Sequence, residues 1–400
     1  MPQWPLTLLV DDAERDHFLP LAFTRPLAHF RFGIRTIQEK WNDALNMETG
    51  ILAHPSLHVK FPTSENSGSL LISGRICPNP ALLEAIGDLE PGQNLADAEG
   101  RWLARRCAAD EGPSSSGFED GLATTYKGEY LGFHNLWELF QKLDDAIADD
   151  FAKLNQADSG TLSSTNTVIG DQPVYLAPGA KAEASIFNTS NGPIYIGPDA
   201  EVMEGCQIRG PFVLGSHSVL KMGAKIYGAT AFGPHVKVGG EVNNSVIFGY
   251  SNKGHDGFLG NSILGEWCNL GADTNNSNLK NNYGIVKLWD YASDALQPTG
   301  LQFCGLIMGD HSKAGINTMF NTGTVVGVSA NVFGSGFPPK FIPSFSWGGA
   351  ESSVTYRLDK ATEVAGAVMA RRQVELSDED RQILATIFEL TAGYRSTDQS

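Results

Sequence analysis

The chain has 400 residues, 42% of them hydrophobic, and carries a formal net charge of −16. This length predicts two or three domains with buried cores. So acidic a chain is not expected to wrap nucleic acid, because neutralising phosphates requires clustered lysine and arginine. The first residues lack the basic start of a signal peptide, and no stretch approaches the roughly 20 apolar residues of a membrane span. We therefore expect neither membrane insertion nor a nucleic acid partner.

Five cysteines occur, and no two of them form a C-x-x-C pair. Their positions are Cys77, Cys107, Cys206, Cys268 and Cys304. This odd number predicts neither a disulfide framework nor a structural zinc site. Free thiols are typical of the reduced cytoplasm, which is the expected location.

Residues 1–155 alternate strand and helix signals. The apolar runs at 6–10 (LTLLV) and 70–73 (LLIS) predict buried strands, and a helix is expected around 80–87. Residues 134–154 place leucine, isoleucine and phenylalanine on one helical stripe. The sequence therefore predicts an α/β domain that ends in an amphipathic helix.

A polar stretch at 156–167 is expected to link this domain to a repeat. From residue 196 to 243, eight consecutive hexads begin with an apolar residue, and the fifth position also has inward character. The lead residues are Ile196, Val202, Ile208, Leu214, Leu220, Ile226, Phe232 and Val238. Period six fits neither a helix nor a simple strand, and eight hexads in a row argue against a β-sandwich with accidental periodicity. It fits a triangular, left-handed parallel β-helix (hexapeptide repeat), which we expect over 168–346.

Residues 347–400 are predicted to form C-terminal helices. A first helix places four residues on one face: Leu358, Ala361, Ala365 and Val368. Ser377 and Asp380 have the spacing of a capping box that opens a second helix. These helices are expected to cover the open end of the β-helix or to pack on a neighbouring subunit, because an uncapped coil exposes unpaired backbone.

The hexad count fails between residues 251 and 284 (SNKGHDGFLGNSILGEWCNLGADTNNSNLKNNYG). We interpret the failure as a loop leaving the wall, where repeat folds place functional residues. His255 lies in this stretch, whereas the other β-helix histidines (217, 235 and 311) occupy outward fourth positions of regular hexads. A neutral imidazole can take a proton from an attacking amine. His255 is therefore the candidate catalytic base, and a loop histidine without a role is the alternative.

The same stretch resembles the acetyltransferase half of a bacterial bifunctional family that makes UDP-N-acetylglucosamine. That family joins a glucosamine-1-phosphate acetyltransferase to an N-acetylglucosamine-1-phosphate uridylyltransferase. Its motif is matched here by His255, by residues 258–260, by residues 269–272 (Asn-Leu-Gly-Ala) and by residues 282–283 (Asn-Tyr). The resemblance implies acetyl-CoA as co-substrate, His255 as general base on an amino sugar phosphate, and a homotrimer with acyl sites between neighbouring β-helices.

On the sugar side, the resemblance implies that Asn269 and Phe258 line the pocket, with Phe258 replacing a tyrosine of the family. Lys287 falls near a family lysine that meets the sugar phosphate. A further arginine and lysine of the family have no clear match here. The nearest cations are Lys221, Lys225, Lys237 and Lys253. Of these we take Lys253 as a substrate-binding candidate.

On the donor side, the resemblance implies that Ala272, Asn282 and Tyr283 contact the thioester end of acetyl-CoA. Backbone or amide donors around Asn282 and Tyr283 could stabilise the oxyanion. No metal is needed for this step.

The N-terminal phrases LPLAFTRP, IRTIQEKW and SGRICPN resemble the nucleotidyltransferase half of the same family. Such a domain normally cradles a triphosphate in a glycine-rich loop after the first strand. Here no glycine occurs between Val10 and Gly33. Pro26 predicts a helix start near Thr24.

Arginine pairs well with phosphate, so Arg25 and Arg31, with Lys40, are candidates to bind the nucleotide in place of that loop. A solvated basic face or inter-domain pairing is the alternative. A nucleotidyl step would need Mg²⁺ to bridge the phosphates, and Asp11 and Asp12 are the candidate ligands.

Two other functions remain open from the sequence. His217 and His235 lie one coil apart, and His255 could complete a zinc site of the carbonic anhydrase type. Alternatively, the protein binds a nucleotide sugar without catalysis and serves assembly. The favoured prediction is a sugar-phosphate acyltransferase that also has the nucleotidyltransferase step implied by the resemblance.

Overall fold

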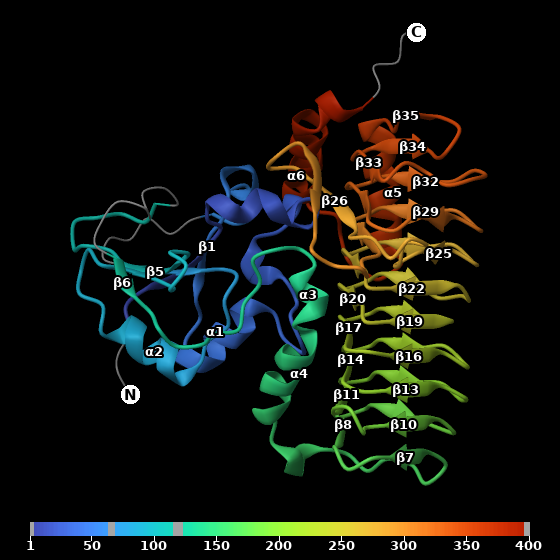
Figure 1. The fold of residues 1–400 in the computed structure, drawn as a ribbon, viewed down its shortest axis with the longest axis horizontal. Coiled ribbons are helices and arrows are strands. Elements are labelled where there is room, and N and C mark those ends of the chain that lie inside the picture. Colours follow the sequence, from blue (N-terminus) through green and yellow to red (C-terminus); the bar gives the residue numbers. More distant parts are fainter. Residues whose placement is uncertain (1–3, 63–68, 115–122, 396–400) are drawn as a thin grey trace. The chain divides into compact units, whose positions relative to one another are not determined.

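The computed structural model describes residues 4–62, 69–114 and 123–395 (Figure 1). The described chain packs into two compact units. The first unit holds the residues up to Leu136 except 19–21 and 32–34. The second unit holds those two short segments and the chain from Trp137 onward.

A six-stranded mixed sheet forms the centre of the first unit, in the order β2-β1-β3-β5-β4-β6. Its strands are β1 (Thr7–Val10), β2 (Gly50–Leu52), β3 (Leu70–Ser73), β4 (Asn94–Ala96), β5 (Trp102–Arg106) and β6 (Ala123–Thr125). Strands β1, β2 and β3 run parallel, whereas β5 runs antiparallel to β3 and β4. All four residues of β1 and of β3 are buried. The predicted strands at 6–10 and 70–73 are confirmed and lie side by side.

Two α-helices and several short 3₁₀ helices accompany this sheet. They are η1 (Ala13–Phe18), η2 (Leu21–Phe23), η3 (Leu27–His29), α1 (Ile37–Leu45), η4 (Pro55–Leu57) and α2 (Pro80–Gly87). Helix α2 confirms the prediction for 80–87. The helix expected to start near Thr24 is wrong, because Pro26 opens only the single turn η3. The long helix begins after Thr36, which forms a capping box with Glu39.

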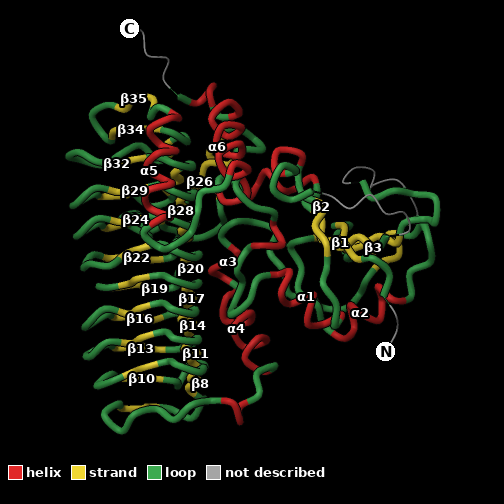
Figure 2. The backbone as a smooth tube through the Cα atoms, turned by 180° about the vertical axis from the view of Figure 1, so that it is seen from behind, coloured by secondary structure: helices red, strands yellow, loops and turns green. Residues whose placement is uncertain are grey.

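The second unit contains the predicted β-helix, built from three parallel walls (Figures 1 and 2). The first wall has β7 (Thr167–Ile169), β10 (Ile186–Asn188), β13 (Gln207–Arg209), β16 (Lys225–Tyr227), β19 (Glu241–Asn243) and β22 (Phe258–Gly260), and it is continued by the pair β25 (Asn275–Asn276) and β30 (Met319–Phe320). The second wall has β8 (Val174–Leu176), β11 (Ile194–Ile196), β14 (Phe212–Leu214), β17 (Thr230–Phe232), β20 (Val246–Ile247), β23 (Ile263–Leu264), β28 (Leu306–Met308), β31 (Thr324–Val326) and β33 (Phe341–Ile342). The third wall has β9 (Lys181–Ala182), β12 (Glu201–Val202), β15 (Val219–Leu220), β18 (Lys237–Val238), β21 (Asn252–Lys253), β24 (Asn269–Leu270), β29 (Lys313–Ala314), β32 (Asn331–Val332), β34 (Ser346–Gly348) and the antiparallel β35 (Ser353–Thr355).

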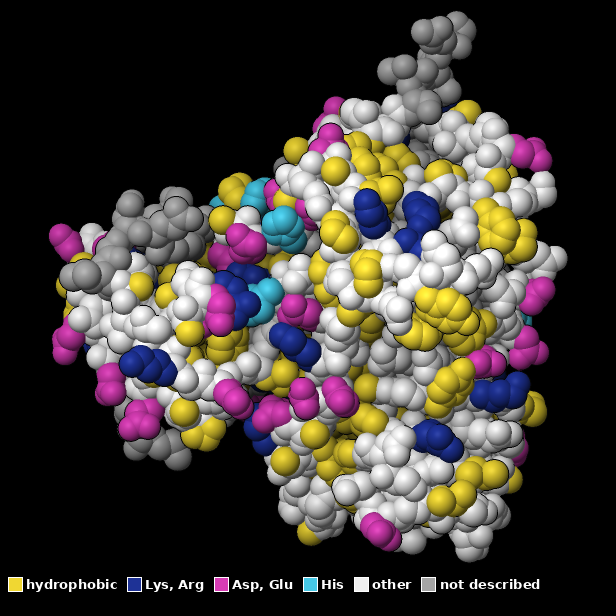
Figure 3. Space-filling model, viewed as in Figure 1, with side chains coloured by type: hydrophobic (Ala, Val, Ile, Leu, Met, Phe, Trp, Pro, Cys, Tyr) yellow, Lys and Arg dark blue, Asp and Glu magenta, His cyan; other side chains and the backbone are white. Residues whose placement is uncertain are grey.

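The hexad pattern is explained by the core between these walls. Each of the eight lead residues is at most 2% exposed. The fifth positions are buried as well, including Phe212, Ser218 and Val236. On the outside of the second unit, hydrophobic side chains reach the surface (Figure 3). Ile186 and Tyr227 on the first wall are exposed.

The predicted loop at 251–284 is wrong for residues 251–276. The wall continues through it, because β21 pairs with β18 and β24, and β22 pairs with β19. The count fails because the corner between β18 and β19 has only residues 239–240, whereas the preceding coil has residues 221–224 there. In addition, Lys253 takes the inward position beside Val238. Gly240 permits the close corner, since a Cβ there would lie 2.8 Å from Asp256 Cα and 3.0 Å from His255 O.

The chain leaves the wall only after Asn276, between β25 and β28. This excursion (residues 277–305) carries an antiparallel hairpin of β26 (Lys287–Asp290) and β27 (Ala295–Pro298). The hairpin packs back on the second unit, where Trp289 stacks on Phe341 with ring centroids 4.2 Å apart.

Helices complete the second unit. They are α3 (Glu138–Gln141), α4 (Leu143–Ala152), η5 (Gln156–Asp158), α5 (Leu358–Ala370), α6 (Asp378–Leu390) and η6 (Ala392–Tyr394). The predicted stripe at 134–154 becomes α3 and α4, and the capping box of Ser377 and Asp380 is confirmed. Helix α5 runs beside the third wall (Figure 2), where Arg372 just past its end bonds to Asn252. Within the described residues, no helix is long and apolar enough to cross a membrane.

Candidate active site

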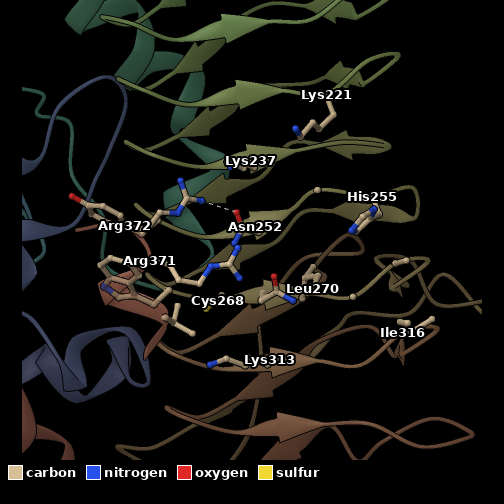
Figure 4. Close-up of a pocket in the computed structure, with 17 residues that line it drawn as sticks. Lys221, Lys237, Asn252, His255, Cys268, Leu270, Lys313, Ile316, Arg371 and Arg372 are labelled. Carbon is tan, nitrogen blue, oxygen red and sulfur yellow. Dashed lines mark hydrogen bonds between the residues drawn. The ribbon is translucent and has the colours of Figure 1, made fainter. Parts of the chain in front are cut away.

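A cavity of about 820 Å³ opens on the outer face of the third wall, beside the end of α5. Its lining includes three predicted site residues, His255, Asn269 and Ala272, which come from two successive coils. Figure 4 shows His255 at one side of this cavity and Arg371 and Arg372 entering from the other. The structure therefore brings together the predicted base, a residue predicted to line the sugar pocket (Asn269) and a residue predicted to contact acetyl-CoA (Ala272).

His255 lies at the corner between the third and first walls, immediately after β21. Its side chain is exposed, and among the described residues none hydrogen-bonds to its ring. A partner that fixes the tautomer of this imidazole must therefore come from a ligand or another molecule.

Lys253 is placed differently from the prediction, because it does not line the cavity. Its side chain is 2% exposed and turns back inside the β-helix. The Nζ donates to Gly239 O at 2.9 Å and to His255 O at 2.7 Å. Burial lowers the pKa of Lys253 to about 8, although nearby carboxylates, Asp256 first, oppose the shift. Lys253 thus fixes the backbone of His255 through a hydrogen bond from inside the β-helix.

The other predicted residues of the acyl site lie away from the cavity. Phe258 belongs to β22 on the first wall. Asn282 and Tyr283 are exposed on the excursion, which leaves the β-helix between the first and second walls, and Lys287 is exposed at the start of β26. Within one chain these four residues therefore do not line the cavity with His255.

The cavity also contains cations that the sequence did not assign together. They are Lys221, Lys237, Lys313, Arg371 and Arg372. Lys221 and Lys237 were noted as nearby cations, but the two arginines reach the site only because α5 docks on the third wall. Arg372 Nη2 donates to Asn252 Oδ1 at 3.1 Å. Burial, followed by the charges of Arg372, Lys221 and Arg371, lowers the pKa of Lys237.

An aromatic stack follows the corner between the second and third walls. His217 stacks on His235 at 4.8 Å, His235 on Tyr250 at 4.7 Å, and Tyr250 on Trp267 at 4.1 Å. His255 lies at a different corner. In the described part of the chain, no three His, Cys, Asp or Glu side chains are grouped to hold a metal ion. The zinc site considered from the sequence is therefore wrong, and the histidine column is a packing feature.

Asp11 and Asp12 follow β1 at the point where the chain passes to β2 on one side and to β3 on the other, which is where open α/β sheets bind ligands. Asp12 Oδ2 accepts bonds from Arg75 Nη2 at 2.8 Å and from Ser73 Oγ at 3.1 Å. The Asp11 carboxylate accepts bonds from the backbone N–H of Leu27 at 2.8 Å and of His54 at 3.0 Å, and burial raises the pKa of Asp11 to about 6. Because protein donors already engage both carboxylates, the pair does not fit a magnesium site.

The cations expected to replace the glycine-rich loop are also largely internal. Arg25 is 7% exposed and Lys40 is 2% exposed. Arg31 Nη1 lies 3.9 Å from Glu39 Oε2. Their placement gives no exposed cradle for a triphosphate, and nucleotide binding by these residues stays a prediction.

A polar network that sequence reasoning missed lies near the same edge of the sheet. Arg75 Nη1 lies 3.2 Å from His134 Nδ1, and His134 Nε2 lies 3.0 Å from Tyr130 Oη. Tyr130 Oη donates to Asp97 Oδ2 at 2.7 Å. Since Arg75 can only donate, His134 Nδ1 accepts and Nε2 carries the proton. No spacing signal in the sequence connects these residues, which the fold alone brings together.

The N-terminal part of the chain is similar to a known family. Residues 7–159 match the sugar nucleotidyl transferase family. Over 87 residues the chain is 36% identical to the bifunctional protein GlmU of Methanocaldococcus jannaschii. The resemblance to this bifunctional family is confirmed. The GlmU match covers 22% of this chain and 21% of that protein, so the chain spans about a fifth of the length of the curated relative.

Solved structures give a weaker likeness. A UDP-N-acetylglucosamine acyltransferase of Arabidopsis is 14% identical and covers 60% of this chain and 86% of its own, with a TM-score of 0.25. The polySia-specific acetyltransferase NeuO is 13% identical and covers 53% of this chain and 99% of its own, with a TM-score of 0.30. At these TM-scores the likeness carries no argument about function.

Proposed function

We propose that the β-helix unit transfers an acetyl group from acetyl-CoA to the amine of an amino sugar phosphate, with glucosamine-1-phosphate as the first acceptor to test. The reaction would belong to cytoplasmic nucleotide-sugar synthesis of the UDP-N-acetylglucosamine type. The observation that carries the proposal is that His255, Asn269 and Ala272 line one cavity. Cations on the same lining suit phosphate-bearing ligands.

The reaction requires one proton acceptor near the amine. The amine nitrogen attacks the thioester carbonyl carbon, so that a C–N bond forms and the C–S bond breaks. The His255 imidazole takes the amine proton and returns it to the leaving thiolate. Lys253 keeps the His255 backbone in place through its bond to the carbonyl oxygen. Uncharged donors near the carbonyl would stabilise the oxyanion.

We further propose that the working form is a homotrimer. Asn282 and Tyr283 lie on the excursion, which leaves the β-helix at a different corner from the one that holds His255. In the proposed trimer, a neighbouring copy therefore supplies these two residues to a site that it shares with His255. The exposed side chains of Tyr283 (65%) and Ile285 (42%) are available for such a contact. Mixing His255→Ala with Tyr283→Ala and letting the subunits exchange tests this arrangement, since mixed trimers regain one intact site. No recovery of activity, or a monomer by native mass spectrometry, would contradict it.

The sugar nucleotidyl transferase match over 7–159 favours a second activity, transfer of a nucleotide to a sugar-1-phosphate. The proposed binding place is the carboxyl edge of β1 and β3. Protein donors engage the carboxylates of Asp11 and Asp12, so these two residues do not supply a metal site. Pyrophosphate release from UTP and sugar-1-phosphate with added Mg²⁺ tests this activity. Nucleotide binding without release would favour the non-catalytic alternative for this unit.

Thiol release from acetyl-CoA with glucosamine-1-phosphate tests the acyl step. We expect wild type to release thiol and His255→Ala to lose at least about 100-fold in rate, as for removal of a general base. His217→Ala is the matched control, because His217 is exposed and does not line the cavity. No thiol release with any amino sugar phosphate would overturn the proposal.

A further inference from the structure

The third wall of the β-helix ends in an edge strand. Among the described strands β35 pairs only with β34, and it is the last strand of the ten-stranded sheet. It lies at the end of the β-helix opposite to β7 (Figure 1). Ser353 and Val354 of this strand are exposed. An edge of this kind presents backbone groups that can pair with another chain.

The hydrogen bonds of the β34–β35 hairpin show which backbone groups face the outer edge. The N–H of Tyr356 donates to Phe345 O at 2.7 Å, and the N–H of Gly349 donates to Ser352 O at 3.0 Å. Hydrogen-bonded and non-hydrogen-bonded pairs alternate along an antiparallel ladder. The middle residue of β35 therefore bonds to β34, and the residues on either side of it turn their N–H and C=O groups to the outer edge.

An exposed apolar patch lies beside this edge. Its four members are between 39% and 56% exposed and are Phe333, Phe337, Trp347 and Val354. The rings of Phe333 and Trp347 meet edge to face with centroids 5.4 Å apart, and Val354 is the cross-strand partner of Trp347. The loop that carries Phe337 is held to the tip of the hairpin, where Ser335 Oγ donates to Glu351 Oε1 at 2.9 Å. A contiguous exposed apolar surface marks a contact with another protein.

The sequence of the edge is complementary to itself about Val354. If two copies of β35 pair antiparallel with Val354 facing Val354, then Ser353 faces Thr355 and Glu351 faces Arg357. This register makes Ser353 and Thr355 a hydrogen-bonded pair, which their outward backbone groups satisfy. Opposite charges at facing positions stabilise antiparallel strand pairs.

The charged side chains at the two ends of the edge are accessible for such a contact. The side chain of Arg357 is 74% exposed and engages Asp359 through Nε at 3.0 Å and Nη2 at 2.6 Å. Its Nη1 can therefore reach a second carboxylate. Glu351 is also exposed. One end of the edge is thus acidic and the other basic, which suits a partner strand of the same sequence that runs in the opposite direction.

We propose that two copies of this chain join through β35, as an antiparallel pair of edge strands flanked by the apolar patch. The contact is a two-fold one, in which the same residues of both copies face each other. It goes beyond the proposed acyl transfer and does not depend on it. It also uses a different surface from the excursion that completes the proposed trimer, so trimers join in pairs and every assembly holds an even number of chains.

Native mass spectrometry and light scattering of the full chain test the proposal. We expect wild type to contain an even number of chains and Val354→Asp half that number, because two carboxylates would then face each other at the two-fold axis. Glu351→Arg and Arg357→Glu should each weaken the association at least about tenfold at low salt, and the double variant should regain the wild-type association. Val59→Asp is the control, because Val59 is an exposed valine of the first unit, and it should leave the number of chains unchanged.

Each outcome decides. Equal numbers of chains in wild type and Val354→Asp overturn the proposal, as does an odd number in wild type. Single charge reversals that weaken association without recovery in the double variant also overturn it, because Glu351 and Arg357 then do not face each other. The charge reversals keep the test valid if Val354→Asp fails to fold. Association through β35 without thiol release would sink the proposed acyl transfer and leave this inference standing.

Discussion

Replacement of Lys253 by methionine tests separately how Lys253 positions His255 and how it affects the stability of the fold. Lys253 occupies an inward position of the third wall, paired with Val238 in the preceding coil. The side chain is 2% exposed, and its ammonium is held by the carbonyl oxygens of Gly239 and His255. Methionine keeps the length and the apolar stem but removes the charge and both hydrogen bonds.

The magnitude follows from the pKa of Lys253, which burial lowers from 10.5 to about 8. That difference corresponds to about 3 kcal/mol by which folding disfavours the charged form. Losing two hydrogen bonds costs about 1 to 3 kcal/mol each, so the terms nearly cancel at pH 7. We expect the free energy of unfolding of Lys253→Met to lie within about 2 kcal/mol of wild type there.

The pH dependence gives the sharper test of stability. Because the folded pKa is lower than the unfolded one, the unfolded chain binds more protons between about pH 8 and pH 10.5. The stability of wild type therefore gains a contribution that rises with pH through this window, by up to about 1.4 kcal/mol per pH unit. Urea unfolding at several pH values should show that this contribution is absent from Lys253→Met and retained in the exposed control Lys225→Met. If the free energies of unfolding of wild type and Lys253→Met differ by the same amount at every pH, the reasoning is refuted.

Activity should respond separately. Without its tether, the backbone of His255 is less well fixed, and we expect kcat for thiol release to fall about 10- to 100-fold with KM little changed. A variant that is as active as wild type would show that Lys253 has no part in positioning His255.

Three further predictions concern the stability of the first unit and of the second unit, each taken by itself. Asp12→Ala should destabilise the first unit by about 3 to 5 kcal/mol in chemical unfolding, because the buried guanidinium of Arg75 loses its carboxylate; an unchanged midpoint would contradict that pairing. Leu270→Ala should cost about 2 to 5 kcal/mol by leaving a hole in the β-helix core, whereas Leu390→Ala, at a residue that is 58% exposed, should cost far less, and equal losses would argue against the assigned core. Burial, then neighbouring positive charge, lowers the pKa of His235, so the melting temperature should fall as pH drops below about 6.5 and His235→Phe should reduce that fall; the same acid sensitivity in both proteins would exclude His235 as its source.

Much of the β-helix was predictable from the sequence, because the first residue of every hexad must point inward and is therefore apolar. The eight lead residues and the capping box at Ser377 are cases where a local pattern has a single structural meaning. The boundary of the excursion was not predictable by counting. Lys253 is polar in an inward position, and the corner between β18 and β19 is shorter than in the preceding coil, so a continuous wall has the sequence pattern of a loop.

The site was predictable only in part for a related reason. His255, Asn269 and Ala272 were named from a contiguous motif, and they line one cavity. Arg371 and Arg372 lie more than a hundred residues away in the chain and reach the cavity through the docking of α5, for which the sequence has no signal. Asp12 was expected to hold a metal, but its partner Arg75 became visible only when β1 and β3 were placed side by side.

The most direct test of the central claim follows the acetyl group itself. The protein is incubated with acetyl-CoA labelled with ¹³C in the acetyl group and with glucosamine-1-phosphate, and the sugar product is identified by mass spectrometry for wild type, His255→Ala and His217→Ala. The account predicts a labelled N-acetylated sugar phosphate with wild type and His217→Ala, and almost none with His255→Ala. Unlabelled acceptor in every sample, or full labelling by His255→Ala, would contradict it.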